Sequence, residues 1–302
     1  MSFGLLLRFL IGGIAAIAFG SAAVACTVTP EDVSAATGDP DTLMALHAKA
    51  ERDCSRAIVD QAAKSAGIAL FNKALKQQGS AQLKSLEAAA GYSKDWRILA
   101  ALGQVQLQSG QPANAARNLQ AALVSLQDDP PSNPPPKSAV KRLITMANNA
   151  RSVSPTYVRS LKTRSGDPGG VAAKTVAGVE IEVVPFPIEF VFGTSDVTET
   201  TRPAVADLAE ILTSESASAI VLAGHTDPVG SDAANMTLSL DRANAIRSEL
   251  IRAGLGDQLT IDVVGCGEAS PPEIDSPELY SQDEIHQIMR RVELVRSGEP
   301  CR

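Results

Sequence analysis

A run of prolines divides this chain into two parts and limits what either part can form. Five of the nine residues in Asp128–Pro136 are prolines. Because proline fixes φ and lacks a backbone N–H, a helix cannot continue through this segment, which is therefore predicted to be an extended spacer. A second break follows at Asp167–Gly170, where proline and two glycines favour a turn. With 302 residues, the chain is long enough for two ordinary domains.

Residues 41–127 are predicted to be helical, because alanine, leucine, glutamine and lysine dominate there and proline is almost absent. Within this stretch, Trp96–Gln127 has the pattern of a helical hairpin that reverses at Ser109–Gln111. Small residues and leucines occupy the positions where two antiparallel helices would meet. These residues are Leu102, Gly103, Ala115, Leu119 and Ala122, and Gly110 lies in the turn between the two helices. In this spacing the hairpin resembles a tetratricopeptide repeat.

An earlier stretch repeats this pattern only loosely, at Gly79, Leu86 and Ala89. A solenoid usually needs about three repeats to bury a continuous core. Two interpretations of residues 26–127 therefore stay open. One is a tetratricopeptide-like array, and the other is a small helical bundle that contains one repeat-like hairpin.

The segment 128–178 is predicted to be a proline-rich and basic linker with a short helix at Ser138–Ala150. Between residues 137 and 165 it carries no acidic side chain, in a protein whose formal net charge is −7. Its basic residues are Lys137, Lys141, Arg142, Arg151, Arg159, Lys162 and Arg164. A solvated helix and linker is the simpler interpretation. Contact with an anionic partner, such as lipid headgroups or a wall polymer, is the alternative.

From residue 179 onward, short apolar runs typical of strands alternate with apolar residues at helical spacing. The predicted strands are 188–192, 219–223, 259–264 and 291–295, and the predicted helices include 205–212 and 240–253. This alternation favours an α/β sandwich in which helices pack on one sheet. The expected fold class of the whole chain is therefore α+β, with an all-α N-terminal region followed by the sandwich.

The first 25 residues have the pattern of a signal peptide. Arg8 is their only charged side chain, an apolar run follows from Phe9 to Phe19, and Ala23–Ala25 supplies an Ala-x-Ala cleavage site. An uncleaved membrane anchor is the alternative, because Phe9–Ala25 is almost long enough to span a bilayer. No second apolar segment of this kind follows, so the rest of the chain is expected in the periplasm.

Four cysteines remain after this segment, and an exported chain can oxidise them to disulfides. Cys26 would be the first residue after cleavage, which is where a bacterial lipoprotein carries its lipid. A usual lipobox has leucine three residues earlier, whereas this chain has Ala23. We therefore expect Cys26 to pair with Cys54, and lipidation of Cys26 is the alternative. Cys266 and Cys301 form a second candidate pair.

The stretch Gly224–Asn244, with the sequence GHTDPVGSDAANMTLSLDRAN, is the most specific motif in the chain. It resembles the signature of the OmpA-like peptidoglycan-binding domain found in OmpA, Pal and MotB, and the resemblance covers residues 179–302. The family implies helices on a mixed sheet and a pocket for the diaminopimelate of the wall stem peptide. Diaminopimelate has an ammonium and a carboxylate on one carbon, so the resemblance implies that Asp227 binds the first and Arg242 the second. An internal salt bridge between Asp227 and Arg242 is the alternative.

The same resemblance assigns further residues to the pocket. Asn235 would support the loop or donate to the ligand, and Thr226 and the backbone near Gly193 would line the pocket. Asn235 and Arg242 share one helical face, together with Ser239, if the helix already includes Asn235. That face would look at the ligand.

Two later motifs also resemble the family, and they are Gly265–Glu268 and Arg290–Glu293. The chain departs from the family pattern at three positions. Gly193 stands where Asp or Asn is usual, His286 replaces an arginine, and Met289 replaces an asparagine. These departures concern the rim of the pocket and its affinity.

Composition and missing motifs exclude several classes of function. The net charge of −7 and the aromatic content of 4% argue against nucleic-acid binding. No nucleophile elbow, phosphate-binding glycine loop or Cys-x-x-Cys motif occurs, and His225 with Asp227 lacks a third metal ligand. We expect a protein without catalysis, cofactor or metal that binds peptidoglycan and tethers the outer membrane, or a periplasmic partner of the helical region, to the wall. The alternative is a periplasmic scaffold whose C-terminal domain has lost the ligand.

Overall fold

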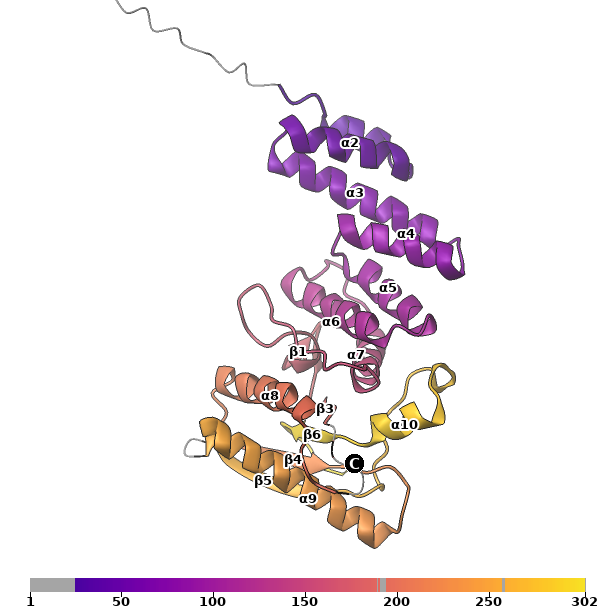
Figure 1. The fold of residues 1–302 in the computed structure, drawn as a ribbon. Helices are drawn as coiled ribbons and strands as arrows, with labels where there is room; N and C mark the ends of the chain where they lie inside the picture. The colour runs from indigo at the N-terminus through magenta and orange to yellow at the C-terminus, as the bar shows by residue number, and fades with distance from the viewer. Residues whose placement is uncertain (1–24, 189, 191–193, 257–258, 302) are drawn as a thin grey trace, which may run out of the picture.

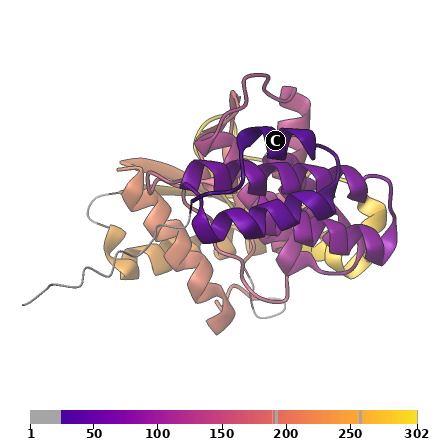
Figure 2. The same cartoon turned by 90° about the horizontal axis from the view of Figure 1, so that it is seen from above.

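The computed structural model describes residues 25–302 with the exception of 189, 191–193, 257–258 and 302. Apart from Ala25, the predicted signal peptide lies outside the described residues. Helices follow one another along the molecule from the N-terminal end toward a sheet formed by C-terminal residues (Figure 1). Seen from above, the indigo and magenta helices overlie one another, and the orange helices of the sheet region project to one side (Figure 2). The observed fold class is α+β, as expected from the sequence.

In the described residues, seven α-helices precede the sheet. They are α1 (Pro30–Ala35), α2 (Pro40–Asp53), α3 (Arg56–Ala74), α4 (Gly79–Tyr92), α5 (Trp96–Gln108), α6 (Pro112–Asp128) and α7 (Lys137–Ser152). Polar side chains fix where several of them begin. The Asp39 carboxylate accepts the Asp41 N–H at 3.1 Å, and the Asp95 carboxylate accepts the Arg97 N–H at 2.9 Å. These contacts satisfy N–H groups that have no partner within the helix.

Helices α5 and α6 form the hairpin predicted for Trp96–Gln127, and their close approach depends on a small residue. A Cβ added at Gly103 would lie 2.6 Å from Leu119 Cγ. Leu119 is fully buried against this glycine, so its replacement by alanine would cost about 2–5 kcal/mol. A small residue also lets α3 lie close to the end of α4, because a Cβ at Gly67 would lie 2.6 Å from Ser93 Cβ.

The segment 128–178, for which the sequence predicts a linker, is packed into the protein. Its helix α7 has 16 residues and buries Val140, Leu143, Met146 and Ala147. The chain after α7 returns to the same core through Val158 and through the short 3-10 helix η1 (Gly170–Ala172). A linker prediction from composition alone misses this packing, because the apolar positions of α7 are spread among basic residues.

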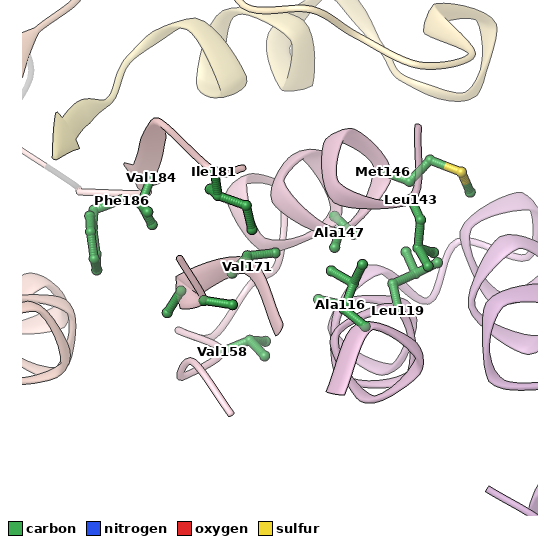
Figure 3. Packing of buried hydrophobic residues seen from close by; sticks show 14 of the residues in the cluster. Ala116, Leu119, Leu143, Met146, Ala147, Val158, Val171, Ile181, Val184 and Phe186 are labelled. Carbon is green, nitrogen blue, oxygen red and sulfur yellow. The ribbon is translucent and has the colours of Figure 1, made fainter. Parts of the chain in front are cut away.

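One hydrophobic core runs from the helices into the sheet (Figure 3). Its side chains come from α6, α7, the chain that follows α7, and the first strand of the sheet. Those labelled in Figure 3 are Ala116, Leu119, Leu143, Met146, Ala147, Val158, Val171, Ile181, Val184 and Phe186. We call helices α1–α7 the helical part. Because burial of apolar surface is the main stabilising contribution to folding, the helical part and the sheet stabilise each other.

The sheet has four strands in the order β3-β6-β4-β5. They are β3 (Val183–Phe186), β4 (Ala219–Gly224), β5 (Thr260–Gly265) and β6 (Val292–Val295). β4 and β5 are parallel, and β6 is antiparallel to both β3 and β4, so the sheet is mixed. The helices of this part are α8 (Arg202–Ser214), α9 (Asp232–Leu250) and α10 (Gln282–Met289). Smaller elements are the pair β1 (Thr175–Val176) and β2 (Val179–Glu180), η2 (Glu199–Thr201), η3 (Ile251–Leu255) and η4 (Pro277–Leu279).

Two predicted elements lie elsewhere in the structure. The first strand of the sheet is Val183–Phe186, whereas the sequence predicted 188–192, of which 189, 191 and 192 lie outside the described residues. Within the described part of that stretch, Phe190 forms an isolated bridge with Val197. Helix α9 begins at Asp232 and not near Leu240, because the Ser231 hydroxyl caps its first turn. The first buried positions of α9 are Asn235 and Ser239, which are both polar, so apolar periodicity does not reveal the start of this helix.

Both candidate disulfides are present. Cys26 is bonded to Cys54 with a Cα–Cα distance of 4.5 Å, and Cys266 to Cys301 with a Cα–Cα distance of 5.1 Å. A sulfur bonded to Cys54 cannot carry a thioether-linked lipid, so the two forms proposed for Cys26 exclude each other. Among the helices of the described residues, none combines the length and the apolar character needed to cross a membrane.

Candidate ligand site at one edge of the sheet

Three motifs of the sequence meet at one edge of the sheet. The parallel strands β4 and β5 end at Gly224 and Gly265, so the loops that follow them leave the sheet at the same edge. β6 runs the opposite way, and Val292 at its start lies opposite Gly224. The two arginines that precede β6 are therefore carried to the edge where β4 and β5 end.

Two glycines let α9 lie directly on the ends of these strands. A Cβ at Gly224 would lie 1.9 Å from the carbonyl oxygen of Ser239, and a Cβ at Gly265 would lie 2.7 Å from that of Met236. Ser239 itself is fully buried. A larger residue at either glycine would push the helix away from the sheet, so these contacts fix the position of α9 and of the side chains on its buried face.

Asp227 lies in the loop after β4 and is 9% exposed. Its Oδ1 accepts the Val229 N–H at 3.2 Å, and its Oδ2 accepts a hydrogen bond from Arg290 Nη1 at 2.5 Å. The backbone carbonyl of Asp227 accepts from Asn235 Nδ2 at 3.3 Å. A carboxylate can accept about four hydrogen bonds, so Asp227 keeps capacity for a further donor.

Asn235, near the start of α9, joins the loop after β4 to the loop after β5. Its Nδ2 also donates to Glu268 Oε2 at 2.5 Å. Glu268 follows Gly267, whose φ of +56° lies in the left-handed region that favours glycine, and whose N–H donates to the Ser239 hydroxyl at 2.9 Å. The Gly-x-Gly-Glu motif thus supplies both the turn and a partner for Asn235. The sequence pattern contained Glu268 but did not identify it as that partner.

Arg242 extends from the same face of α9 and is 5% exposed. Its guanidinium carbon lies 4.9 Å from the ring centre of Phe190, and its Nε donates to the Thr194 carbonyl at 3.4 Å. In the described part of the chain, no carboxylate oxygen lies within 4.0 Å of its guanidinium nitrogens. Burial lowers the pKa of Arg242, and the charge of Arg290 lowers it further, against the opposing charge of Asp227. Several N–H donors of this buried cation are left for an anion.

Arg290 is the ion-pair partner of Asp227, and it is a residue whose role the sequence did not reveal. It follows α10 directly, and its side chain is 38% exposed. The described residues contain no salt bridge between Asp227 and Arg242, so the internal pair considered from the sequence is replaced by this one. The double-arginine motif was the only available signal, because the pairing depends on the antiparallel course of β6.

A buried polar layer lies next to the site. His225 Nε2 is 3.1 Å from Glu293 Oε2, and Arg291 Nε donates to Glu293 Oε1 at 2.6 Å. Burial lowers the pKa of His225, and this effect exceeds that of the Glu293 hydrogen bond, which raises it. Burial alone would raise the pKa of Glu293, but the His225 hydrogen bond and the Arg291 charge together lower it. Among the described residues, no group of three His, Cys, Asp or Glu side chains could hold a metal ion.

The two remaining predicted residues have different outcomes. Thr226 is buried, and its N–H donates to the Gly267 carbonyl at 2.9 Å. Its Oγ1 has no hydrogen-bond partner within the described residues. Gly193 lies outside the described residues.

Residues 189–282, which include Asp227, Asn235 and Arg242, match the sequence profile of the OmpA family. The chain carries an OmpA family domain. The match includes the loop after β4, all of α9 and the loop after β5, and it ends where α10 begins. Arg290 follows the matched residues.

Two curated relatives each match about a third of this chain. A stretch of 95 residues is 34% identical to outer membrane porin F of Pseudomonas aeruginosa and covers 32% of this chain and 27% of the porin. Porin F of Pseudomonas fluorescens is 34% identical over 96 residues, which are 32% of this chain and 28% of that porin. The chain therefore spans about a quarter of the length of these curated relatives.

Among solved structures, the chain is similar to the peptidoglycan-associated lipoprotein from Burkholderia pseudomallei. The sequence identity is 28%, and the TM-score is 0.30. The similarity covers 36% of this chain and 86% of that protein.

Two departures from the family pattern lie near Arg290 in the structure. Met289 contributes its backbone carbonyl, which accepts from Arg291 Nη1 at 3.2 Å. His286 Nε2 lies 2.9 Å from Gln282 Nε2 on α10. Neither side chain contacts Asp227 or Arg242 through a hydrogen bond or ion pair in the described residues.

Proposed function

We propose that the OmpA family domain binds the diaminopimelate of peptidoglycan stem peptides and performs no catalysis. Asp227 accepts hydrogen bonds from the ligand ammonium, and Arg242 donates to the carboxylate on the same carbon. Asn235 holds the loop that carries Asp227. Thr226 lines the pocket.

The observation that carries this proposal is the environment of Arg242. Burial of a charged group is unfavourable unless an opposite charge and hydrogen bonds compensate for it. Phe190 and one carbonyl oxygen stabilise the guanidinium only in part. A ligand carboxylate would supply two acceptors in the planar arrangement that a guanidinium matches.

The surroundings of Asp227 fit the other half of the ligand. Its carboxylate has one backbone donor and one arginine donor, which leaves lone pairs for an ammonium. An anion and a cation held at one edge of a sheet discriminate for a zwitterionic amino-acid centre and against groups with a single charge. Affinity for one such centre would be modest, and repeated centres on a polymer would increase retention.

In this proposal the protein is a periplasmic tether. The domain holds the wall, and the rest of the chain connects it to the outer membrane or to a protein partner of the helical part. The names of the Pseudomonas porins support a place in the cell envelope. The array α2–α6 is the part proposed to bind the protein partner.

A second candidate function is a periplasmic scaffold whose OmpA family domain has lost the ligand. The observation that favours it is the ion pair between Arg290 and Asp227, which already compensates the carboxylate. In that case the helical part would hold a partner, and the domain would only position it.

Isothermal titration of residues 26–302 with meso-diaminopimelate separates the two functions. Both parts of the protein are kept because the helical part and the sheet share one core. Pimelate, which lacks the ammonium groups, and 1,5-diaminopentane, which lacks the carboxylates, serve as matched control ligands. The proposal predicts that the wild-type chain binds meso-diaminopimelate and neither control ligand. It also predicts that Arg242→Gln does not bind meso-diaminopimelate. An absence of binding to the wild-type chain would favour the scaffold.

A further inference from the structure

A cavity of about 420 Å³ lies between the end of α7 and residues that flank the OmpA family match. One side is formed by the end of α7 and the residues after it, including Arg151 and Tyr157. The other side includes Ile188, Gln287 and Arg290. Three arginines and no acidic residue are among the described residues that line it. The volume is in the range of pockets for small ligands.

Arg151 brings an incompletely compensated charge to this cavity. It is 1% exposed, its Nε donates to the Val158 carbonyl at 3.1 Å, and its Nη2 donates to the Tyr157 hydroxyl at 3.1 Å. Its Nη1 has no hydrogen-bond partner in the described residues. The nearest carboxylate, Asp207, lies 3.7 Å from Nη2 and already accepts from the Tyr157 hydroxyl at 2.6 Å and the Ser160 N–H at 2.8 Å. Burial raises the pKa of Tyr157, so the phenol stays neutral.

Two further guanidinium groups line the same cavity. Arg159 pairs with Glu210, and Arg290 pairs with Asp227, but neither carboxylate belongs to the lining. Arg290 therefore touches both the cavity and the carboxylate proposed to bind diaminopimelate. The cavity and the Asp227 carboxylate are therefore separated by no more than the length of one arginine side chain.

We propose that this cavity is a second subsite for the same wall peptide and binds a carboxylate next to the diaminopimelate centre. This inference rests on the proposed function of Asp227 and Arg242. A stem peptide carries a free carboxylate on its D-glutamate, which directly precedes diaminopimelate. The arginines provide the donors for that group, and Pro155, Pro187 and Ile188 provide apolar surface for the aliphatic part of the peptide.

The cavity gives the helical part a role in ligand recognition. Among the described lining residues, only Pro203 lies within residues 189–282 that match the OmpA family, so the subsite is formed mainly by residues before and after that match. The domain and the end of α7 share one core, so the two sides of the cavity are held in a fixed relationship. Such preorganisation reduces the entropic cost of binding.

Gln287 offers a variant that tests the subsite without disturbing the fold. Its side chain makes no hydrogen bond in the described part of the chain, and it lines the cavity from α10. Gln287→Glu keeps the size of the side chain and adds a negative charge that would compete with the ligand for the arginines. Gln282→Glu makes the same change on the same helix at an exposed position outside the cavity, and it is the matched control.

Isothermal titration of residues 26–302 with two ligands measures the contribution of the cavity to affinity. The tripeptide L-alanyl-γ-D-glutamyl-meso-diaminopimelate should bind the wild-type chain about tenfold more tightly than free meso-diaminopimelate, because it also occupies the cavity. Gln287→Glu should remove about that tenfold gain and change the affinity for free meso-diaminopimelate by no more than about twofold. Gln282→Glu should leave both affinities unchanged.

Equal wild-type affinities for the two ligands, or unchanged tripeptide binding by Gln287→Glu, would overturn the subsite and leave the diaminopimelate site standing. If the wild-type chain binds neither ligand, the proposed function fails and the subsite fails with it.

Discussion

Arg290 Nη1 lies 2.5 Å from Asp227 Oδ2, and the two residues reach each other only because β6 returns antiparallel beside β4. The carboxylate proposed to hold the ligand ammonium is thus already paired within the protein. The buried guanidinium of Arg242 has no such partner in the described residues. Ligand binding must therefore exchange or share one ion pair while it completes another.

The first prediction concerns this competition. Arg290→Gln should raise the affinity for free meso-diaminopimelate by a few fold, because the ammonium no longer competes with a guanidinium for Asp227. Arg142→Gln, which removes an exposed arginine paired with Asp275, is the control and should have no effect. Isothermal titration measures both. Loss of binding in Arg290→Gln would show instead that Arg290 contacts the ligand directly.

The second prediction concerns the contact between α9 and the sheet. Gly224→Ala places a Cβ 1.9 Å from the Ser239 carbonyl oxygen, so it should lower the free energy of unfolding by about 3 kcal/mol or more. Gly91 lies at an exposed helical position, and a Cβ added there would have no described atom within 4 Å apart from its own helix backbone and chain neighbours. Gly91→Ala should therefore raise the free energy of unfolding by up to about 1 kcal/mol. Urea denaturation of both variants provides the measurement. Equal stability of Gly224→Ala and wild type would contradict the observed packing.

Local sequence patterns predicted much of this region. The polar face of α9 was expected from the spacing of Asn235, Ser239 and Arg242, and all three are buried on one side of that helix. The strand 219–223 and the helix 205–212 also lie within observed elements. These features follow from periodicity over a few turns or residues, which a single sequence contains.

Other features depend on contacts between distant segments, and the sequence did not reveal them. The pairing of Arg290 with Asp227 needs the register between β4 and β6. The packing of α7 needs a partner surface on α6, without which its mixture of basic and apolar residues is typical of a solvated helix. Strand β3 was not predicted, because the run Val183–Phe186 contains no polar residue and therefore shows no alternation of polar and apolar side chains.

The third prediction concerns pH. His225 is buried, and its pKa is lowered in the folded state, so the unfolded chain binds the proton more readily. The contribution of neutral His225 to the free energy of unfolding is therefore fully present at pH values above the ordinary pKa of histidine. It decreases as the pH falls through that pKa toward the lower pKa of the folded state. The lowered pKa of Glu293 acts in the same direction at lower pH. The free energy of unfolding in urea should decrease from pH 7.5 to pH 5.5, and less steeply in His225→Gln. The same slope in both proteins would show that protonation of His225 does not contribute to the pH dependence of stability.

The fourth prediction concerns Cys26. Its sulfur is bonded to Cys54, so a chain isolated from the periplasm without reductant should show no alkylation of cysteine by iodoacetamide, and reduction should expose four reactive thiols. Intact mass spectrometry measures the added mass. Incorporation of labelled palmitate that disappears in Cys26→Ala would contradict the disulfide and support a lipid anchor.

We propose that Asp227 and Arg242 together hold the zwitterionic centre of the wall peptide. The most direct measurement is co-sedimentation of residues 26–302 with diaminopimelate-containing sacculi, beside Asp227→Ala and Arg242→Ala. Circular dichroism confirms that the variants are folded. The wild-type chain should sediment with the sacculi, and each folded variant should stay in the supernatant. Retention of either variant at the wild-type level, or no retention of the wild-type chain, would contradict it.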